Sequence, residues 1–385
     1  MKMILIGNYL PDRQESMIRF AEMLRRGFET EGLHVTIWWP TAFFGKGLKS
    51  TDSGIGKWLG YLDKYIIFPA VLQYGLLKIA LVNSSVRFHI CDHSNAPYLK
   101  YLPAQKTSIT CHDVIAIRGS LGYPDCYQPA SFLGKKLQQW IFKNLSKACS
   151  MAVVSKLTLM QLRELIPHEE AVHKEWHVIH NAFNAEFKKI ERSQTIKLVS
   201  RVGIDPNVPF ILHVGSGLPR KNRKLLLKMA IALGVKWSGN ICYAGEALEE
   251  DLLQYAEAHG LRNRIISVEK PPHEVLVGLY NGCEAFIFPS LSEGFGWPVI
   301  EAQACGAPVI ASNVEPMPEV SGNAALHADP FNPTEFASAF LSLQNDDYRS
   351  SLIEKGLENS KKFNLANMTN AYLQLHRIKS YNNAN

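Results

Sequence analysis

The chain has 385 residues, of which 46% are hydrophobic and seven are cysteines, and its formal net charge is +6. The length indicates two domains of ordinary size, and the scattered cysteines, without C-x-x-C or metal-site spacing, favour free thiols in a reducing cytoplasm over a disulfide scaffold. The modest charge comes without a recognisable aromatic and basic module, so we expect no nucleic-acid partner.

Strand-like and helix-like segments alternate through the first half, a pattern typical of a parallel α/β sheet. Strands are predicted at residues 3–6, 35–39, 87–90, 108–110 and 152–154. A helix is predicted from about residue 16 to residue 30, with Ser16 as its candidate N-cap. Residues 66–82 are rich in apolar side chains but include Pro69 and Lys78, whereas a spanning helix needs about 20 cleaner residues. The apolar run at residues 3–6 is too short for a signal peptide, so a soluble or peripheral protein is expected.

Between residues 43 and 65, aromatic residues and lysines interleave. They are Phe43, Phe44, Lys46, Lys49, Lys57, Trp58, Tyr61, Lys64 and Tyr65. Residues 1–200 hold 25 Lys and Arg against 16 Asp and Glu, a net charge of +9. Such a segment in a basic half could contact a phosphate-bearing molecule or an anionic bilayer surface. It could equally be an ordinary helix that buries Trp58, beside basic residues that are only solvated.

His112 follows the apolar run at residues 108–111, which places it at the carboxyl end of a predicted strand. A structural, hydrogen-bonded histidine is the ordinary interpretation of a lone His-Asp pair such as His112 and Asp113. From the residues alone, His112 can be either such a structural histidine or part of a ligand-binding site.

A second alternating series begins at residue 210. Strands are predicted at residues 210–214, 241–243, 265–268 and 285–288, and a helix at residues 222–233. The polar stretch at residues 183–200 is interpreted as the domain boundary. Two tandem Rossmann-like sheets are therefore expected.

The loop at residues 215–222, GSGLPRKN, lies between a predicted strand and a predicted helix. Glycines allow the backbone to approach a ligand, and Arg220 and Lys221 supply positive charge at the helix start. Two basic residues at such a place are often only solvated, so this loop indicates a phosphate site only together with other residues.

The most informative string is residues 290–301, SLSEGFGWPVIE, which follows the predicted strand 285–288. Pro298 suits the first turn of a helix, and Gly306 suits a left-handed helix end. Glu293 is therefore expected in a loop at the carboxyl end of a strand, with Glu301 about one turn into the next helix. Two carboxylates beside an anion site indicate a ligand with both hydroxyls and phosphates, such as a nucleotide sugar. The alternative is an acidic helix N-terminus that complements the helix dipole.

The Glu293-to-Glu301 spacing and the following residues through Gly322 resemble retaining glycosyltransferases of family 4, which have the GT-B fold. The resemblance implies an α/β protein with two Rossmann-like domains whose parallel sheets face each other across a cleft. Residues 1–190 would be the acceptor-side domain and residues 191–364 the nucleotide-sugar domain. Residues 365–385 would form a helix that crosses back to the first domain.

The resemblance also assigns roles to individual residues. Glu293 would bind sugar hydroxyls, Glu301 the ribose hydroxyls, Arg220 and Lys221 the leaving diphosphate, and His112 the donor sugar. The remaining donor-binding positions would be Gly215, Ser216, Gly294, Phe295 and Gly296. Ser216 stands where many members have an arginine, and residues 8–16 lack the usual glycine pair, so side chains are expected to make the contacts of that first loop.

The implied activity is transfer of a sugar, with retention, from a nucleotide diphosphate sugar (GDP-mannose or a UDP-sugar) to a cell-surface polysaccharide or lipid-linked glycan. No D-x-D carboxylate pair is present, so neither a metal nor a cofactor is expected. The expected location is the cytoplasm, with possible peripheral contact at the inner face of the membrane. An inactive sugar-nucleotide-binding subunit of a glycan assembly complex is the alternative.

Overall fold

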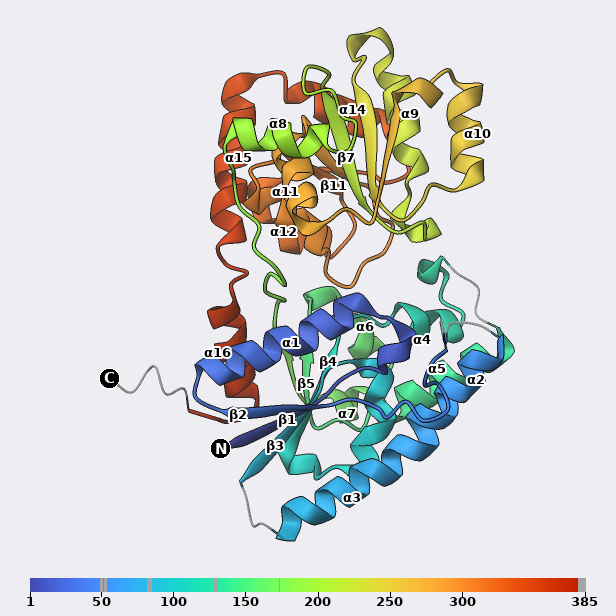
Figure 1. The fold of residues 1–385 in the computed structure, drawn as a ribbon, viewed down its shortest axis with the longest axis vertical. Helices are drawn as coiled ribbons and strands as arrows, with labels where there is room; N and C mark the ends of the chain where they lie inside the picture. Colours follow the sequence, from blue (N-terminus) through green and yellow to red (C-terminus); the bar gives the residue numbers. More distant parts are fainter. Residues whose placement is uncertain (49–50, 52–53, 82–84, 128–130, 173, 380–385) are drawn as a thin grey trace. The chain divides into compact units, whose positions relative to one another are not determined.

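The computed structural model describes residues 1–379 except 49–50, 52–53, 82–84, 128–130 and 173 (Figure 1). The described residues divide into two compact units. The first unit holds those of Met1–Tyr123, Ala130–Asn184 and Asn364–Asn385, and the second those of Pro124–Pro129 and Ala185–Phe363.

The sheet of the first unit has six parallel strands in the order β2-β1-β3-β4-β5-β6. They are β1 (Lys2–Ile6), β2 (His34–Trp38), β3 (Val86–Ile90), β4 (Thr107–Cys111), β5 (Ser150–Val153) and β6 (Glu175–Val178). The strand order reverses between β1 and β3, which makes their carboxyl ends the topological switch point of this sheet.

The sheet of the second unit also has six parallel strands, in the order β12-β11-β10-β7-β8-β9. They are β7 (Phe210–Gly215), β8 (Asn240–Gly245), β9 (Ile265–Glu269), β10 (Ala285–Phe288), β11 (Val309–Ser312) and β12 (Leu326–Ala328). Counted from β7, this is the 3-2-1-4-5-6 order of Rossmann sheets. Its switch point lies between β7 and β10, where ligands of such sheets bind.

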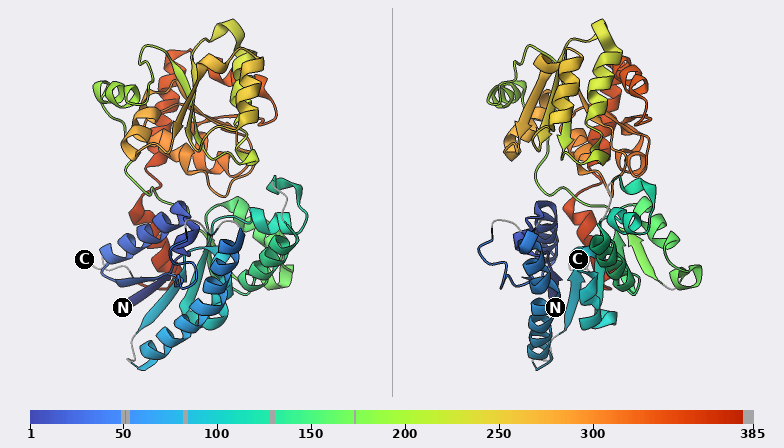
Figure 2. Two further views of the ribbon diagram at one scale, coloured as in Figure 1. Left: turned by 45° about the vertical axis from the view of Figure 1, so that its right-hand side comes forward. Right: turned by 90° about the vertical axis from the view of Figure 1, so that its right-hand side faces the viewer.

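Helices cover both faces of each sheet (Figure 2). In the first unit they are α1 (Glu15–Thr30), α2 (Gly54–Leu62), a π-helical turn (Asp63–Ile67), α3 (Phe68–Leu81), α4 (Ile115–Ser120), α5 (Phe132–Leu145), α6 (Lys156–Glu164), α7 (His168–Val172) and α16 (Leu365–Leu375). In the second unit they are α8 (Arg192–Ser200), α9 (Lys224–Leu233), α10 (Glu250–Ala258), α11 (His273–Gly282), α12 (Trp297–Ala304), α13 (Met317–Ser321), α14 (Pro333–Ser342) and α15 (Asp346–Ser360).

Short 3-10 helices connect these elements. They are Leu10–Asp12, His93–Tyr101, Ala104–Lys106, Pro124–Cys126, Pro219–Lys221, Gly234–Lys236, Arg262–Arg264 and Gly322–Ala324. The segment Pro219–Lys221 matters for the candidate site described below, because it includes the two basic residues of that site, Arg220 and Lys221.

Each sheet has a hydrophobic core on both faces because successive strand residues point to opposite sides. In β1, Ile4 and Ile6 pack into the core that includes α3 and α5, and Met3 and Leu5 into the core that includes α1 and α16. Strands buried on both faces read as continuous apolar runs, and for that reason their positions were predictable from the sequence.

The C-terminal helix α16 is part of the first unit. Hydrogen bonds between side chains link the end of the helix to the sheet of that unit. The Tyr372 hydroxyl lies 2.8 Å from the Thr110 hydroxyl, and His376 Nε2 lies 3.2 Å from Nδ1 of His89. All four side chains are buried. Burial lowers the pKa of His376 to about 3 and holds that of His89 well below its usual value, so both rings are neutral.

Strand β10 begins and ends where the sequence predicts, and Pro298 lies in the first turn of α12. One expectation is wrong. Ser16 is not an N-cap, because α1 begins at Glu15 and Gln14 occupies the cap without a side-chain bond. The division between the two units falls after Asn184, within the polar stretch 183–200, and the later part of that stretch is helix α8, whose few apolar residues pack on the second unit.

Candidate active site in the second unit

The loops that follow β7 and β10 are joined directly at the switch point of the second sheet. The Leu291 amide donates to the Arg220 carbonyl oxygen at 2.7 Å. Asn222 Nδ2 donates to the Pro289 carbonyl oxygen at 3.2 Å and to that of Pro330 at 2.7 Å. The two strings that carry the candidate residues therefore form one connected surface.

Glu293 lies between the two cations of the 3-10 turn. Its Oε2 is 2.9 Å from Arg220 Nη1, and its Oε1 is 2.6 Å from Lys221 Nζ. Arg220 Nη1 also donates to the Ser292 carbonyl oxygen at 2.9 Å. The side chain of Glu293 is 9% exposed and that of Arg220 22%, so the cluster is sheltered while remaining open on the arginine side. The structure thus brings Arg220, Lys221 and Glu293 into direct contact.

Burial would raise the pKa of Glu293, but the charges of Lys221 and Arg220 outweigh it and hold that pKa below its usual value. Glu293 is therefore a carboxylate at neutral pH. One carboxylate between two cations leaves a net positive charge, which suits an anionic group placed beside them.

Asn222 closes the turn in a left-handed conformation, with φ of 52°. Few residues other than glycine and asparagine adopt that conformation at low cost. The two carbonyl oxygens that its side chain reaches add a second reason for asparagine. The turn therefore aims Arg220 and Lys221 at the end of β10.

Glu301 is buried on α12, and its Oε2 accepts a hydrogen bond from the Tyr280 hydroxyl at 2.9 Å. Helix α12 follows Gly296, whose φ is 99° and whose position leaves no room for a side chain, because a Cβ would lie 2.5 Å from Met317 Cε. Phe295 is buried beside Trp297 and Phe363. The segment between the two glutamates is therefore fixed from both sides.

Arg223 is a structural residue of the site that sequence reasoning missed. It is buried, and its guanidinium donates to the carbonyl oxygens of Gly215 at 2.6 Å, Glu246 at 3.1 Å and Ala247 at 3.0 Å. A buried arginine that donates to three carbonyl oxygens holds the ends of β7 and β8 together. Only its place beside Asn222 distinguishes it in the sequence.

Ser216 and Gly217 make up the rest of the glycine loop. The Gly217 amide donates to Glu246 Oε2 at 2.9 Å, so this donor is already used within the protein. Gly215 is the last residue of β7, directly before Ser216. Positive charge near this loop comes from Arg220, Lys221 and the buried Arg223, and not from position 216.

His112 lies in the first unit, directly after β4. Its Nε2 is 2.9 Å from the Cys91 carbonyl oxygen, and its ring packs edge-on against Phe20 at 4.5 Å between centroids. Burial lowers its pKa, although the nearby Asp92 carboxylate acts in the opposite direction. Asp113 Oδ1 accepts the Ile115 amide at 3.0 Å, which fixes the loop that follows.

The first loop of the same unit is held by side chains. Asn8 is buried at the switch point between β1 and β3, and its Nδ2 donates to Asp92 Oδ2 and to Gln14 Oε1, each at 2.5 Å. Its Oδ1 accepts from Asn95 Nδ2 at 3.0 Å. Within the protein these side chains order the loop that lacks glycines.

Residues 195–359 match the family model described as glycosyl transferases group 1. Over these residues the chain is similar to the group 1 glycosyl transferases. This family matches the resemblance carried by the Glu293-to-Glu301 string, and both glutamates lie inside the matched range.

The curated relatives of this chain are distant. It is 34% identical over 175 residues to O-antigen chain mannosyltransferase B of Escherichia coli, covering 44% of this chain and 46% of that protein. It is 23% identical over 275 residues to O-antigen chain mannosyltransferase RfbU of Salmonella typhimurium, covering 71% and 70%. The chain spans less than half the length of the first curated relatives it matches.

Solved structures match nearly the whole length. Sucrose-phosphate synthase of Thermosynechococcus elongatus superposes with a TM-score of 0.74 at 17% identity, covering 98% of each chain. WaaG, a glycosyltransferase involved in lipopolysaccharide biosynthesis, gives 0.67 at 13% identity, covering 97% of this chain and 99% of that one. At such identities the likeness shows the fold, which is GT-B with two parallel sheets.

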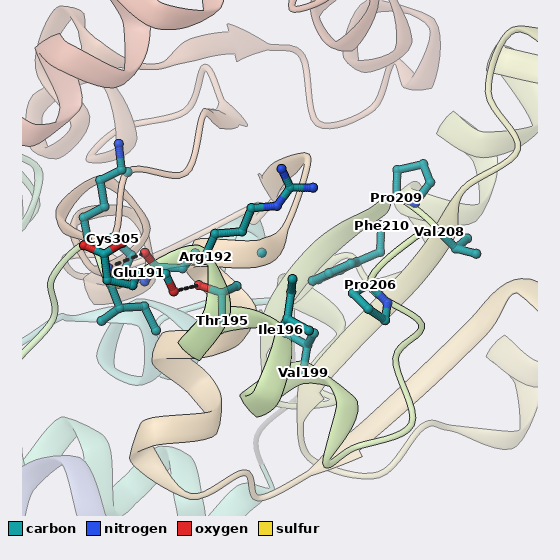
Figure 3. Close-up of a pocket in the computed structure, with 15 residues that line it drawn as sticks. Glu191, Arg192, Thr195, Ile196, Val199, Pro206, Val208, Pro209, Phe210 and Cys305 are labelled. Carbon is teal, nitrogen blue, oxygen red and sulfur yellow. Dashed lines mark hydrogen bonds between the residues drawn. The ribbon is translucent and has the colours of Figure 1, made fainter.

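A cavity of about 620 Å³ lies elsewhere in the second unit (Figure 3). Its lining includes Arg192 and Thr195 of α8, Phe210 at the start of β7, and Cys305 after α12. It is therefore at the amino edge of the sheet, opposite to the edge that carries Glu293. The charged cluster and not this cavity is the candidate active site.

The described part of the chain contains no group of three or more His, Cys, Asp or Glu arranged to hold a metal ion. All seven cysteines are free. Among the described helices, none has the length and apolar character needed to cross a membrane.

Proposed function

We propose that this chain is a retaining, metal-independent glycosyltransferase. It transfers a sugar from a nucleotide diphosphate sugar to a hydroxyl of a cell-surface polysaccharide or a lipid-linked glycan at the inner face of the membrane. The observation that carries the proposal is the cluster of Arg220, Lys221 and Glu293 at the switch point of a Rossmann sheet in the part of the chain that matches the family.

The leaving diphosphate is the natural partner of the two cations. As the bond between the sugar C1 and the phosphate oxygen breaks, negative charge grows on the diphosphate, and preorganised cations stabilise it without rearrangement. Arg220 offers a planar fork for phosphate oxygens, and Lys221 offers a point charge. The acceptor hydroxyl then bonds to C1 on the face that the diphosphate leaves, and its proton passes to a phosphate oxygen of the leaving group.

Glu293 has two tasks in this scheme. Without donor it neutralises part of the charge on Arg220 and Lys221, each of which bonds to a different carboxylate oxygen. When the donor is bound, its diphosphate replaces Glu293 as the partner of Arg220 and Lys221. The Glu293 carboxylate then accepts hydrogen bonds from the sugar hydroxyls. Its lowered pKa keeps it an acceptor at neutral pH.

The roles of the other site residues follow from the resemblance described above. Glu301, oriented by Tyr280, accepts the ribose hydroxyls. Gly215, Ser216 and the backbone amides of Gly294, Phe295 and Gly296 bind the phosphates and sugar. His112, neutral because of its burial, contributes a contact to the sugar from the first unit.

The relatives named as mannosyltransferases favour a mannose donor, GDP-mannose in the first instance, with a UDP-sugar as the next candidate. Their names assign them to O-antigen chains, which favours a growing surface glycan as the acceptor.

Titration calorimetry with GDP, UDP and ADP, followed by donor hydrolysis with the matching nucleotide sugars, tests the proposal. We expect one nucleotide to bind most tightly and its sugar to be hydrolysed slowly without acceptor. Nucleotide binding without hydrolysis or transfer of any donor would instead support the inactive assembly subunit. If no nucleotide binds, both the glycosyltransferase and the inactive subunit are excluded.

A further inference from the structure

The helical segment Gly54–Leu81 exposes an apolar stripe. It consists of α2, the π-helical turn and α3 in succession, along the outside of the first unit (Figure 1). Its large apolar residues with 38% to 78% of their surface accessible are Ile55, Trp58, Leu62, Ile66, Val71, Tyr74 and Leu77. Successive members lie three to five residues apart, close to the helical repeat, so they line one side of the segment. We name this set the outer face.

A loop beside the segment adds two exposed phenyl rings. Phe43 and Phe44 are 65% and 43% exposed, and their rings meet edge-on at 4.9 Å. The fully buried Asp63 holds this loop, because its carboxylate accepts the amides of Phe43 and Phe44 at 3.0 Å and that of Gly45 at 2.9 Å. The Tyr9 hydroxyl donates to the same carboxylate at 2.5 Å. Asp63 therefore fixes the loop that exposes these two rings, and both of its carboxylate oxygens accept hydrogen bonds.

The charge around the outer face is positive. Residues 41–110 contain eight Lys and Arg, three Asp and no Glu. Two of the three carboxylates, Asp63 and Asp92, are buried. Lys46, Lys57 and Lys78 are exposed, and Lys78 Nζ lies 4.5 Å from the ring centre of Tyr74 on the outer face. A large apolar surface with cations and few accessible carboxylates matches an anionic, apolar partner.

We propose that the outer face and the Phe43–Phe44 loop dock on the anionic surface of a phospholipid bilayer. An amphipathic helix with a Trp, a Tyr and flanking lysines lies in the plane of the interface, with apolar side chains among the acyl chains and ammonium groups at the lipid phosphates. The inference deepens the proposed function, on whose lipid-linked acceptor it rests. Binding to vesicles is measured without donor, so the membrane proposal and the proposed glycosyltransferase activity can fail separately.

The apolar surface continues inward at the end of the segment. Leu77 also lines a cavity of about 760 Å³, together with Leu76, Val86 and Phe88. Lys100 and Lys106 lie at the same cavity, so cations accompany apolar side chains there as well. This combination matches the acyl chain and phosphate of a lipid.

Not every lysine of the segment is available to lipid. Lys64 Nζ is 2.7 Å from Asp12 Oδ2, its side chain is only 13% exposed, and it lies 4.8 Å from the ring centre of Tyr61. It stabilises the loop after β1. Lys49, which the sequence places in the same group, lies outside the described residues. The lysines to test are therefore Lys46, Lys57 and Lys78.

The experiment is co-sedimentation of the full chain with phosphatidylglycerol–phosphatidylcholine vesicles and with pure phosphatidylcholine vesicles, at low and high salt. The face variant is Trp58→Ser/Ile66→Ser/Leu77→Ser, and its matched control is Ile231→Ser/Val235→Ser/Phe331→Ser, which removes exposed apolar residues of the second unit. The charge variant is Lys46→Gln/Lys57→Gln/Lys78→Gln, and its control is Lys228→Gln/Lys236→Gln/Lys355→Gln. Circular dichroism and nucleotide binding check that each variant is folded.

The wild type should bind the anionic vesicles at low salt and leave them at high salt. The charge variant should lose on the order of 100-fold in partition coefficient, about fivefold for each lysine. The face variant should lose at least tenfold, and both controls should bind like the wild type. Wild type that ignores anionic vesicles, or face and charge variants that bind as well as their controls, would overturn the proposal. Reversible dimerisation that the face variant abolishes, without vesicle binding, would assign the outer face to a second copy of this chain instead.

Discussion

Glu293 is the residue on which the proposed chemistry depends most. Replacing it by glutamine removes the charge that binds Arg220 and Lys221 and turns one of the two acceptor oxygens offered to the sugar into an amide donor. We expect turnover to fall on the order of 100-fold or more, the size seen when one transition-state contact is lost, while nucleotide affinity changes by only a few fold. Steady-state kinetics and calorimetry measure the two quantities separately.

Glu269→Gln is the matched control, because it removes an exposed carboxylate at the carboxyl end of β9 in the same sheet. Turnover should be unchanged in this control. If Glu293→Gln weakens nucleotide binding as much as it lowers turnover, the assignment of Glu293 to the sugar is wrong.

Glu301 is expected to act on the ribose, and a double cycle tests that directly. Glu301→Ala should weaken binding of the nucleoside diphosphate by about 1–3 kcal/mol, the worth of hydrogen bonds to a charged group. With the 2′,3′-dideoxy nucleotide the same substitution should have almost no effect, because the partner hydroxyls are absent. An equal loss with both nucleotides would show that Glu301 acts through packing with Tyr280 and not through the ribose.

At this scale the sequence revealed the charged side chains but not their supports. Arg220, Lys221, Glu293 and Glu301 stand in recognisable strings, and the structure joins the first three within hydrogen-bond distance. Residues that hydrogen-bond to backbone groups carry no such pattern. The buried Arg223 is one example and Asp63, which accepts three backbone amides, is another.

Helix α16 makes the stability of the first unit depend on pH. His376 is neutral when folded, with a pKa of about 3, but titrates near 6.5 when unfolded. Its folded pKa is the lower one, so its contribution to stability is complete above pH 6.5 and is lost as the pH falls toward 3. The free energy of unfolding should fall in that window by about 1.4 kcal/mol per pH unit for this histidine.

Urea unfolding at pH 7, 6 and 5 measures that slope. His376→Gln should make the slope smaller than in the wild type, whereas His259→Gln, at an exposed site, should leave it unchanged. The same slope in wild type and His376→Gln would contradict the assignment of a buried neutral ring to His376.

The strands that the sequence revealed are those whose apolar residues form a nearly unbroken run. Strand β10 is a continuous apolar run and was predicted at its observed ends, whereas β6 and β12 were missed. The run of β6 includes exposed Glu175 and His177, and β12 is only three residues long. Helix α8 was hidden because its few apolar residues, such as Leu198 and Val199, are outnumbered by polar ones.

For the whole molecule, the strand order explains why residues far apart in sequence form one site. Arg220 and Glu293 are 73 residues apart, but β7 and β10 are adjacent, and the switch point brings their loops together. The sequence indicated alternating strands and helices without their order in the sheet. The structure supplies that order.

The proposal of metal independence also concerns the whole enzyme. EDTA should leave donor hydrolysis and transfer largely intact, because the cations of Arg220 and Lys221 are expected to neutralise the diphosphate. The rate is measured before and after exhaustive chelation, with apo-protein supplemented with magnesium or manganese as the comparison. Complete loss with EDTA that either metal restores would contradict this part of the mechanism.

The most direct test of the central claim is the anomeric configuration of the sugar that the enzyme releases or transfers. NMR spectra recorded in the first minutes of hydrolysis of an α-linked nucleotide sugar, before mutarotation, report that configuration without a known acceptor. The proposed mechanism predicts that the α anomer forms first and that Glu293→Gln suppresses its formation. Initial release of the β anomer would contradict a retaining transfer assisted by the leaving diphosphate.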